Sequence, residues 1–269
     1  MPTLVRSWNL LHGNTAPPDG TSRLEEMVVL ASADAPALLC LQEVPPSALP
    51  RLEEWSGMAC HGVVARAPSL GPLPIPVALG ARLTRLDPAR LRSLFSGQAN
   101  AVLVRRDIAV LDRETLPLNP PDFVRATAAL IGLDRLAVLA WAKEPRVAQA
   151  LRLRLPDGRA LCLVHLHATS FPSNPAVPDA EVARAVARLR ALAAPGEIAV
   201  LAGDLNVPAG ASAALAALAA AGFSAPGGWI DHVLVRGAAA SAPLAWEADR
   251  RTRAGRLLSD HAPVEVTIA

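Results

Sequence analysis

The sequence predicts an α/β fold in which many short strands alternate with a few helices. Short apolar runs rich in β-compatible residues recur along the chain, and segments with helical spacing lie between some of them. Hydrophobic residues make up 52% of the 269 positions, which is enough to bury a large core. We therefore expect one domain over residues 1–269.

Eight segments have the pattern of β-strands. Some alternate apolar and polar residues and others are apolar throughout, as expected for sheets that are buried on one or both faces. The segments are residues 3–10, 37–44, 101–106, 150–155, 160–168, 197–207, 229–237 and 262–269.

Three segments have the pattern of helices. Thr21 or Ser22 can cap the first of them, and Gly222 is a common terminator for the last. The three segments are residues 21–33, 178–194 and 211–222. The Pro-rich residues 67–80 fit neither a central strand nor a helix interior, so they predict an excursion on the surface.

The composition argues against several classes of protein. A formal net charge of +2 gives no strong field for polyanions, so affinity for nucleic acid would need a local patch. The first residues lack a signal-peptide pattern and no apolar run has the length of a membrane span, so we expect no membrane insertion. The cysteines have no metal-ligand spacing, which favours a reducing, cytoplasmic compartment. They are Cys40, Cys60 and Cys162.

Polar side chains at the ends of strand-like segments are the main functional signal. In VLAGDLNVP, residues 200–208, an apolar run ends with Asp204 and Asn206. On a continuing strand these two side chains share one face, although taken alone they also fit an ordinary turn. The other polar groups of this kind are Asn9, Glu43, His165, His167, Asp231, His232, Asp260 and His261. Burying so many without partners is costly, so we expect them to converge on one another, on a cation or on a solvated cleft.

These residues resemble the motifs of a known family, in the family's order. The motifs are WN at 8–9, QE at 42–43, QANAVLVR at 98–105, an HL-type strand, GDLN at 203–206, DH-L at 231–234 and SDHAPV at 259–264. The ordered set resembles the endonuclease/exonuclease/phosphatase superfamily, to which deoxyribonuclease I belongs. The resemblance implies a four-layer α/β sandwich, with two central, mainly antiparallel or mixed sheets between helices and the site at one rim.

The resemblance further implies that Asn9, Glu43 and Asp260 hold a divalent cation. Oxygen-only ligands suit Mg²⁺ or Mn²⁺, and Mg²⁺ is the first choice. Without the resemblance, Glu43 fits equally well an N-cap or a surface acid after a strand.

Asp204 is the candidate to orient and deprotonate the attacking water, with Asn206 holding that water or the phosphate. Asp231 is expected to hold His261 in a dyad that fixes the tautomer and raises the basicity of the imidazole. Asp204 and His261 therefore compete for the role of general base. The resemblance favours Asp204 beside the water and His261 against the phosphate.

His167 is expected to contact the phosphate, because it lies next to the loop after its strand. His165 is expected to be a satisfied core histidine, and His232 to support the loop of Asp231. His12 fits a surface or supporting position.

Further residues are candidates for substrate binding. Asn100 belongs to the QANAVLVR motif. A run of arginines before the SDH motif can form a phosphate clamp or an ordinary solvated loop. These are Arg250, Arg251, Arg253 and Arg256. Tryptophans that could line a groove are Trp55, Trp141, Trp229 and Trp246.

The function predicted from these observations is a metal-dependent phosphoester hydrolase that uses an activated water, with a phosphodiester as the favoured substrate. A DNA or RNA nuclease of the same fold is the alternative, although the lack of tyrosine and the near-neutral charge weaken it. A non-catalytic scaffold comes third, because the motif acids and the SDH histidine are all present. The substrate, the number of metal ions and the oligomeric state stay open.

Overall fold

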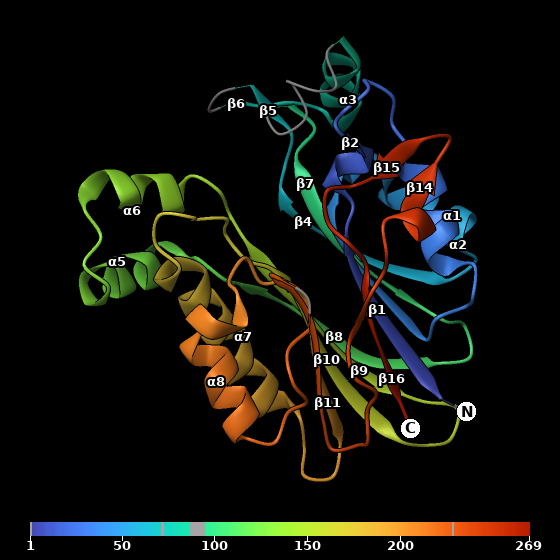
Figure 1. Ribbon diagram of the computed structural model, residues 1–269. Helices are drawn as coiled ribbons and strands as arrows, with labels where there is room; N and C mark the ends of the chain where they lie inside the picture. The colour runs from blue at the N-terminus through green and yellow to red at the C-terminus, as the bar shows by residue number, and fades with distance from the viewer. Residues whose placement is uncertain (1, 71–72, 87–94, 228) are drawn as a thin grey trace.

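Two β-sheets packed face to face form the centre of the protein (Figure 1). The computed structural model describes residues 2–70, 73–86, 95–227 and 229–269. The first sheet has the order β13 (Leu244–Ala245), β16 (Val264–Ile268), β1 (Thr3–Asn9), β3 (Leu38–Val44), β7 (Gln98–Val104) and β4 (Ala59–Arg66). The second has the order β12 (Asp231–Arg236), β11 (Ile198–Asp204), β10 (Ala160–His167), β9 (Val147–Arg154) and β8 (Ala109–Pro117). Each sheet is mixed, because β1 is parallel to β3 and β10 is parallel to β11, while the other neighbours are antiparallel.

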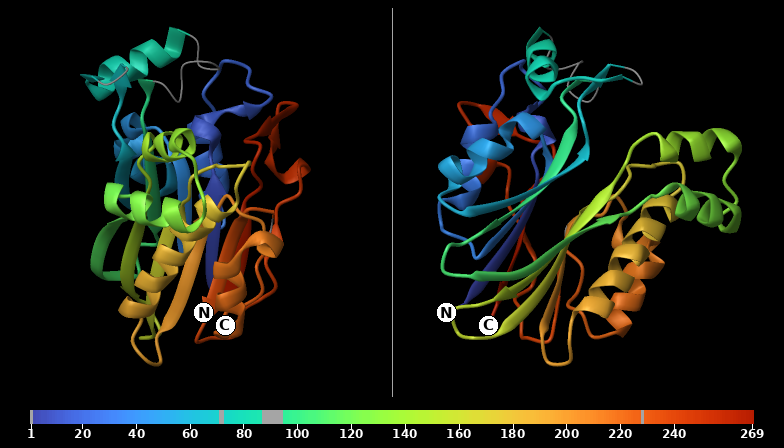
Figure 2. Two further views of the ribbon diagram at one scale, coloured as in Figure 1. Left: turned by 90° about the vertical axis from the view of Figure 1, so that its left-hand side faces the viewer. Right: turned by 180° about the vertical axis from the view of Figure 1, so that it is seen from behind.

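Helices cover the outer face of each sheet, which gives the four layers expected from the resemblance (Figure 2). Helices α1 (Leu24–Ser32) and α2 (Leu52–Ser56) pack on the first sheet, and α7 (Ala176–Leu192) and α8 (Ala213–Ala220) pack on the second. Between the sheets lies an apolar core of alternate strand residues such as Val5, Cys40 and Leu163. Burial on both faces explains why a central strand such as β11 is apolar up to its last residue, Asp204.

The remaining elements stand at or near the ends of the sheets. Helices α5 (Pro121–Leu130) and α6 (Arg135–Ala142) project beside α7, and α3 (Val77–Leu86) lies on the other side of the molecule (Figure 1). The short strands are β2 (Thr15–Ala16), β5 (Ser69–Leu70), β6 (Leu73–Pro74), β14 (Thr252–Arg253) and β15 (Arg256–Leu258). Single 3-10 turns are η1 (Leu11–Gly13), η2 (Pro46–Arg51), η3 (Ala209–Ala211) and η4 (Asp249–Arg251).

The α/β prediction and the eight predicted strands are confirmed, with differences at their ends. The strand predicted over 197–207 ends at Asp204, and the strand predicted from residue 229 begins at Asp231. The three predicted helices are α1, α7 and α8. The Pro-rich excursion holds the small β5–β6 ribbon outside the two main sheets, but its last residues, 77–80, already belong to α3; residues 71–72 lie outside the described residues.

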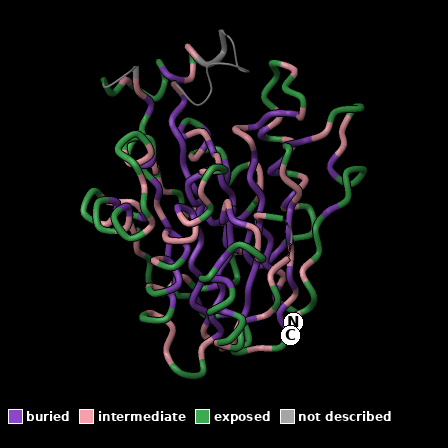
Figure 3. Tube along the Cα trace, turned by 60° about the vertical axis from the view of Figure 1, so that its left-hand side comes forward, coloured by how far each residue is buried: buried purple, intermediate pink, exposed green. Residues whose placement is uncertain are grey.

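The sheet ends decide where a site can form. Buried residues follow the strands, while exposed residues gather on the helices and connecting loops (Figure 3). Both chain termini lie at one end of the sheets, and β1 runs from there to the opposite end, where Asn9 lies (Figure 1). Among the described residues, no helix is long and apolar enough to cross a membrane.

Candidate active site

The polar strand ends come together where the two sheets meet. In the first sheet the parallel register puts Asn9 beside Gln42, the residue before Glu43. In the second sheet Asp204 lies between His167 of β10 and Asp231 of β12. A hydrogen bond of 2.9 Å from Asn9 Nδ2 to Asp204 Oδ2 joins the two sheets. The predicted convergence of these groups is therefore present in the fold.

Asp204 is the most enclosed acid of the cluster, with 1% of its surface exposed. Its Oδ2 accepts from Asn9, and its Oδ1 accepts from the backbone N–H of Asn206 at 3.0 Å. Burial raises the pKa of Asp204 to about 7, and the negative charge of Asp231 acts in the same direction. A carboxylate with a pKa near neutrality can take a proton from water and release it again, which is the property of a general base.

Gly203 allows Asp204 to reach this position. Its φ is +148°, and a Cβ built on it would lie 1.9 Å from the carbonyl oxygen of Leu166 on the neighbouring strand. Any side chain at this residue must push β10 and β11 apart, next to both His167 and Asp204. The glycine of the GDLN motif is thus required by a close approach of two backbones.

We expect Gly203→Ala to lower the free energy of unfolding by about 3 kcal/mol, the upper range for overpacking, and to reduce activity through displacement of Asp204. Gly158→Ala is the matched control, because Gly158 also has a positive φ but has open space around its Cβ position. Urea unfolding of both variants measures the difference. Equal losses of stability would mean that the contact with Leu166 has no special cost.

Asn206 is placed differently from the sequence expectation. Because β11 ends at Asp204, strand alternation does not set the direction of the Asn206 side chain. Asn206 instead has a left-handed backbone, with φ of 50°, and its Nδ2 donates to the carbonyl of Ala168 at 2.9 Å. Its backbone N–H holds Asp204. The half-buried Asn206 therefore joins the loop after β11 to the loop after β10.

His261 and Asp231 form a dyad. His261 Nδ1 donates to Asp231 Oδ2 at 2.7 Å, and its Nε2 lies 3.8 Å from Asp204 Oδ2. Burial lowers the pKa of His261, but the hydrogen bond to Asp231 and the nearby negative charges outweigh it and raise the pKa to about 10. His261 is therefore an imidazolium at neutral pH, with Nε2–H directed into the cluster.

Ser259 fixes the loop that carries the dyad histidine. Its hydroxyl donates to the carbonyl of Asn9 at 2.7 Å and accepts from the backbone N–H of His261 at 3.1 Å. The indole N–H of Trp8 donates to the carbonyl of His261 at 2.9 Å. The serine of SDH and the tryptophan of WN thus have structural roles that hold His261 in place.

His167 and His165 lie in different environments, although both belong to β10. His167 Nε2 is 3.5 Å from Asp204 Oδ2, inside the acidic cluster. His165 lies in the interior between Gln42, 2.7 Å from its Nε2, and Gln149, 3.3 Å from its Nδ1. Burial lowers the pKa of His165 to about 3, so it is a neutral histidine with both nitrogens hydrogen-bonded.

The acids expected to hold a cation border the cluster at different places: Glu43 lies beside Asn9 and His167, whereas Asp260 Oδ1 lies 4.0 Å from His261 Nε2. Glu43 Oε1 is 3.3 Å from Asn9 Nδ2 and 4.0 Å from His167 Nε2. The side chain of Asp260 is 55% exposed, and its Oδ1 lies 3.5 Å from Ser259 Oγ, which itself contacts Asn9. Carboxylate and amide oxygens of this kind are hard ligands that fit Mg²⁺ or Mn²⁺.

A second group of possible ligand atoms consists of Asp204, Asp231 and His261, which lie within 4.8 Å of one another. The Nδ1–H of His261 is already donated to Asp231, and a protonated imidazole repels a cation. This group of three therefore fits a cation poorly.

Backbone strain is concentrated at this site. Seven non-glycine residues among the described ones have positive φ, and five of them lie in or next to the cluster. These five are Leu11, His12, Glu43, Asn206 and Ser259. Such conformations cost about 1–3 kcal/mol each and persist where the surroundings enforce them, typically at functional sites. The strain therefore coincides with the polar strand ends.

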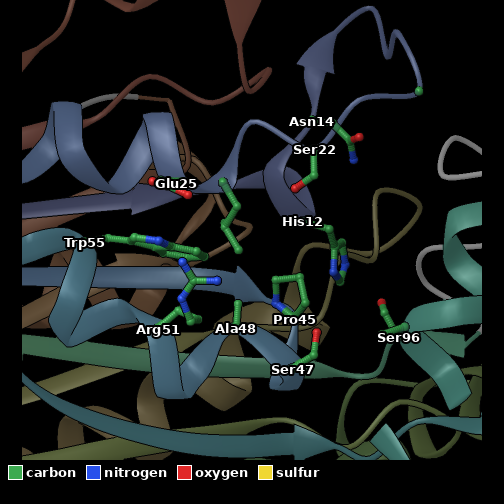
Figure 4. A pocket seen from close by; sticks show the side chains of 13 residues that line it. His12, Asn14, Ser22, Glu25, Pro45, Ser47, Ala48, Arg51, Trp55 and Ser96 are labelled. Atoms are coloured by element: carbon green, nitrogen blue, oxygen red, sulfur yellow. The ribbon is translucent and has the colours of Figure 1, made fainter. Parts of the chain in front are cut away.

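Two pockets border the cluster. One of about 420 Å³ is lined by His12, Pro45, Arg51, Trp55 and other residues, and His12 Nε2 lies 3.4 Å from Glu43 Oε2 (Figure 4). The other, of about 350 Å³, is lined by Asp231, Asp260, His261, Trp229 and neighbouring residues. The acidic cluster thus has room for chemical groups on both of its sides.

The arginine run does not form a clamp at the cluster. Arg251 is buried and donates to three backbone carbonyls of the SDH loop. Arg250 lies over the ring of Trp246 and pairs with Glu265. Arg253 donates to backbone carbonyls, and Arg256 lies 3.9 Å from Asp19. These contacts make the run a structural support of the loop instead of the expected phosphate fork.

Other predicted residues also have structural contacts. Asn100 is buried in β7 and donates to the carbonyl of Val147 at 3.1 Å. His232 is buried and donates to the carbonyl of Val207 at 3.3 Å, so it supports the loop after Asp204, and it also interacts with the backbone of Gly227, in the segment before Asp231. Trp141 and Trp246 are buried, whereas Trp55 and Trp229 each line one of the two pockets.

Residues 7–261 match the sequence model of the Endonuclease/Exonuclease/phosphatase family. The chain belongs to this family. The match includes every strand end that contributes to the cluster, so the family, the fold and the convergence of motifs agree. No curated protein matches the chain.

Solved structures of this family have the same fold. An endonuclease/exonuclease/phosphatase from Beutenbergia cavernae DSM 12333 superposes with a TM-score of 0.67 at 16% identity, covering 99% of this chain and 71% of that one. TDP2 from Caenorhabditis elegans gives 0.62 at 16% identity, covering 100% and 74%. A mannosyl-6-phosphatase from Bacteroides thetaiotaomicron VPI-5482 gives 0.63 at 16% identity, covering 99% of both chains. At these identities the likeness shows the fold alone.

Gln98 and Arg146 escaped sequence reasoning, and His12 was expected only at a surface or supporting position. His12 follows the WN motif and contacts Glu43, while Gln98 and Arg146 both contact His167 Nδ1, at 2.7 and 3.0 Å. Gln98 opens the QANAVLVR motif, which could have pointed to it. Arg146 lies just before β9 without any motif, and no sequence signal identifies it.

Proposed function

We propose that the protein is a metal-dependent phosphodiester hydrolase in which Asp204 activates the attacking water. The observation that carries the proposal is the buried Asp204 with a raised pKa, placed between a neutral His167 and a protonated His261. Family members are hydrolases of the nuclease and phosphatase type, which agrees with this chemistry. Two histidines held in opposite protonation states serve different roles in one reaction.

In this proposal Asp204 accepts a proton from water as the water oxygen bonds to phosphorus. The P–O bond to the leaving group breaks in the same displacement, and the leaving alkoxide takes a proton from solvent. Asn9 and the backbone of Asn206 orient its two oxygens by the hydrogen bonds described above. The charged Nε2–H of His261 balances the negative charge that develops on the phosphoryl oxygens, with Asp231 keeping the ring protonated and aligned. Asn206 acts by ordering the two loops beside the phosphate.

Glu43, Asn9 and Asp260 would hold Mg²⁺, or alternatively Mn²⁺. A bound cation supplies Lewis-acid stabilisation of charge on the phosphoryl group. The carboxylates of Glu43 and Asp260 fit this role because they are hard oxygen donors and because the Glu43 side chain is 20% exposed, within reach of solvent ions. Asn9 instead directs its Nδ2 at Glu43, and its Oδ1 accepts from the backbone N–H of Leu11 at 3.0 Å.

The two bordering pockets favour a diester over a monoester. A phosphodiester carries an organic group on each side of phosphorus, and a pocket lies on the Glu43 side as well as on the His261 side of the cluster. The mannosyl-6-phosphatase among the structural neighbours makes a phosphate monoester the natural comparison substrate.

All three cysteines are free, which agrees with the expected cytoplasmic location.

Nuclease activity is the second candidate. Trp229 is 75% exposed in one pocket and Trp55 lines the other, and exposed indoles can stack on nucleobases. Arg251 is held by backbone carbonyls of the SDH loop, and the described partners of Arg250, Arg253 and Arg256 lie outside the cluster, so binding of a long polymer backbone by this run has less support.

The assay compares bis-p-nitrophenyl phosphate, p-nitrophenyl phosphate, plasmid DNA and phospholipid, each with Mg²⁺, with Mn²⁺ and with EDTA. We expect metal-dependent hydrolysis of the small diester that exceeds hydrolysis of the monoester. Cleavage of plasmid that falls steeply with salt would favour the nuclease. Full activity in EDTA would contradict the proposed dependence on a metal ion. Activity on the monoester alone would contradict the proposal that the substrate is a diester.

We expect Glu43→Gln to weaken Mg²⁺ binding and turnover together, because it removes one charged ligand while keeping the shape of the side chain. Titration of activity against Mg²⁺ should show a half-saturation concentration raised by about 10- to 100-fold, comparable with the loss reported for altered metal environments. Glu54→Gln is the control, since Glu54 is an exposed acid on α2 paired with Arg51. An unchanged Mg²⁺ dependence in Glu43→Gln would place the ion elsewhere.

A further inference from the structure

Arg146 lies against the edge of the His167 ring opposite the acidic cluster. Its Nη1 is 3.0 Å from His167 Nδ1, while the Nε2 of the same ring is 3.5 Å from Asp204 Oδ2. Arg146 is only 4% exposed, although arginine is seldom buried. Burial of a charged guanidinium costs free energy unless partners compensate for the lost water, so the contacts of Arg146 must account for its burial.

The position of Arg146 is fixed from two directions. Its backbone N–H donates to Asn119 Oδ1 at 2.8 Å, and its carbonyl accepts from the N–H of Leu118 at 2.8 Å. Its Nη2 pairs with Glu144 Oε2 at 3.0 Å. Asn119 also donates to the carbonyl of Glu144 at 2.8 Å, so the same loop aligns both members of the pair. The guanidinium therefore has little freedom to leave His167.

The contact determines which nitrogen of His167 carries the proton. A guanidinium has only donors, so the Nδ1 that faces Arg146 must accept and cannot carry hydrogen. The amide of Gln98, 2.7 Å from the same Nδ1, could present either its nitrogen or its oxygen, but beside Arg146 only its N–H fits. The proton of the neutral ring must then lie on Nε2, which points at the acidic cluster.

We propose that Arg146 is a positioning residue that holds His167 in the Nε2-protonated tautomer. His167 then meets the phosphate only as a hydrogen-bond donor and takes no proton during the reaction. The identity of the acceptor as a phosphate rests on the proposed function, whereas the tautomer rests on the contacts of the folded protein alone. The arrangement separates the tasks of the two site histidines: His167 supplies a neutral donor and His261 a charged one.

Long-range ¹H–¹⁵N correlation spectra of the intact protein measure the tautomer directly. The His167 signals are identified by their loss in His167→Gln. We expect only Nε2 to be protonated in the wild type. In Arg146→Met, which keeps the length of the apolar stem, Gln98 can rotate its amide and accept from Nδ1, so the Nδ1-protonated form should appear. Gln98→Leu should keep the wild-type pattern, and Arg146→Lys, which retains a donor-only cation, should restore it.

Turnover provides a second readout. We expect Arg146→Met to lower kcat by about 10²-fold at nearly unchanged KM, the size of effect that follows loss of one preorganised donor, and Arg146→Lys to recover part of the loss. Arg152→Met is the control, because Arg152 lies on β9, the strand that follows Arg146, and pairs with Glu197 away from the site.

Nε2 as the sole protonated nitrogen in Arg146→Met would overturn the proposal, as would an Nδ1-protonated ring in the wild type. If Arg146→Met does not fold, Arg146→Gln gives the same test, because its amide can accept from Nδ1–H. A wild-type protein with no phosphoesterase activity but with the expected spectra would contradict the proposed function and leave the tautomer assignment standing.

Discussion

Asp204→Asn should abolish most of the turnover while the protein stays folded. Asparagine keeps the shape of the side chain and can still accept one hydrogen bond, but it cannot take a proton from water. General-base contributions are commonly about 10²–10⁴-fold, and we expect a loss of that size. Single-turnover hydrolysis of the small diester at saturating Mg²⁺ and pH 8, where Asp204 with its pKa of about 7 is ionised, measures the effect.

The control for Asp204→Asn is Asp157→Asn, the same chemical change in the turn between β9 and β10 at the other end of the sheet. A thermal melt accompanies each variant. We expect the melting temperature of Asp204→Asn to stay close to that of the wild type, because relief of a buried charge offsets the hydrogen bond lost to Asn9 or Asn206. Turnover near the wild-type value in a folded Asp204→Asn protein would contradict the catalytic role.

The dyad should respond to mutation as one unit. His261→Ala removes the charged donor, and Asp231→Asn removes the partner that keeps the imidazole protonated and aligned. We expect each single change to lower kcat by about 10²–10³-fold, as for loss of a preorganised donor. The double variant should be little worse than the poorer single one, because groups that act together are not additive.

Single-turnover rates of the wild type, the two single variants and the double variant form the cycle that measures this coupling. His61→Ala combined with Asp231→Asn is the control pair, because His61 lies on β4, in the first sheet, and has no described contact with Asp231. Losses that multiply for His261→Ala and Asp231→Asn, as they should for the control pair, would rule out the dyad.

Much of the fold could be predicted from sequence because the central strands are buried on both faces. Strands such as β3, β10 and β11 are almost wholly apolar and easy to recognise. The longer strands that were missed, β4 and β8, lie at the edges of their sheets, where most side chains are half-buried or exposed. Exposure removes the apolar periodicity on which strand recognition depends.

Prediction of the site was most successful for acids and histidines in motifs and weakest for residues that act through longer side chains. Asp204, Asp231 and His261 were expected to meet, and they do. The arginine run was expected at the phosphate, but charge alone does not say where a guanidinium points, and Arg251 turns inward to backbone carbonyls. Arg146, which no motif marks, lies beside His167 instead.

The sequence by itself determined the α/β class, the order of the motifs and the acids and histidines of the site, because strand burial and polar strand ends leave a local pattern. Only the tertiary structure decided the protonation of the histidines. His165 and His167 are two residues apart on one strand, yet one lies between two glutamines and the other between Arg146 and Asp204. Those neighbours come from β3, from β9, from the segment just before β9 and from β11, and burial and charge from distant segments set a pKa that no local pattern contains.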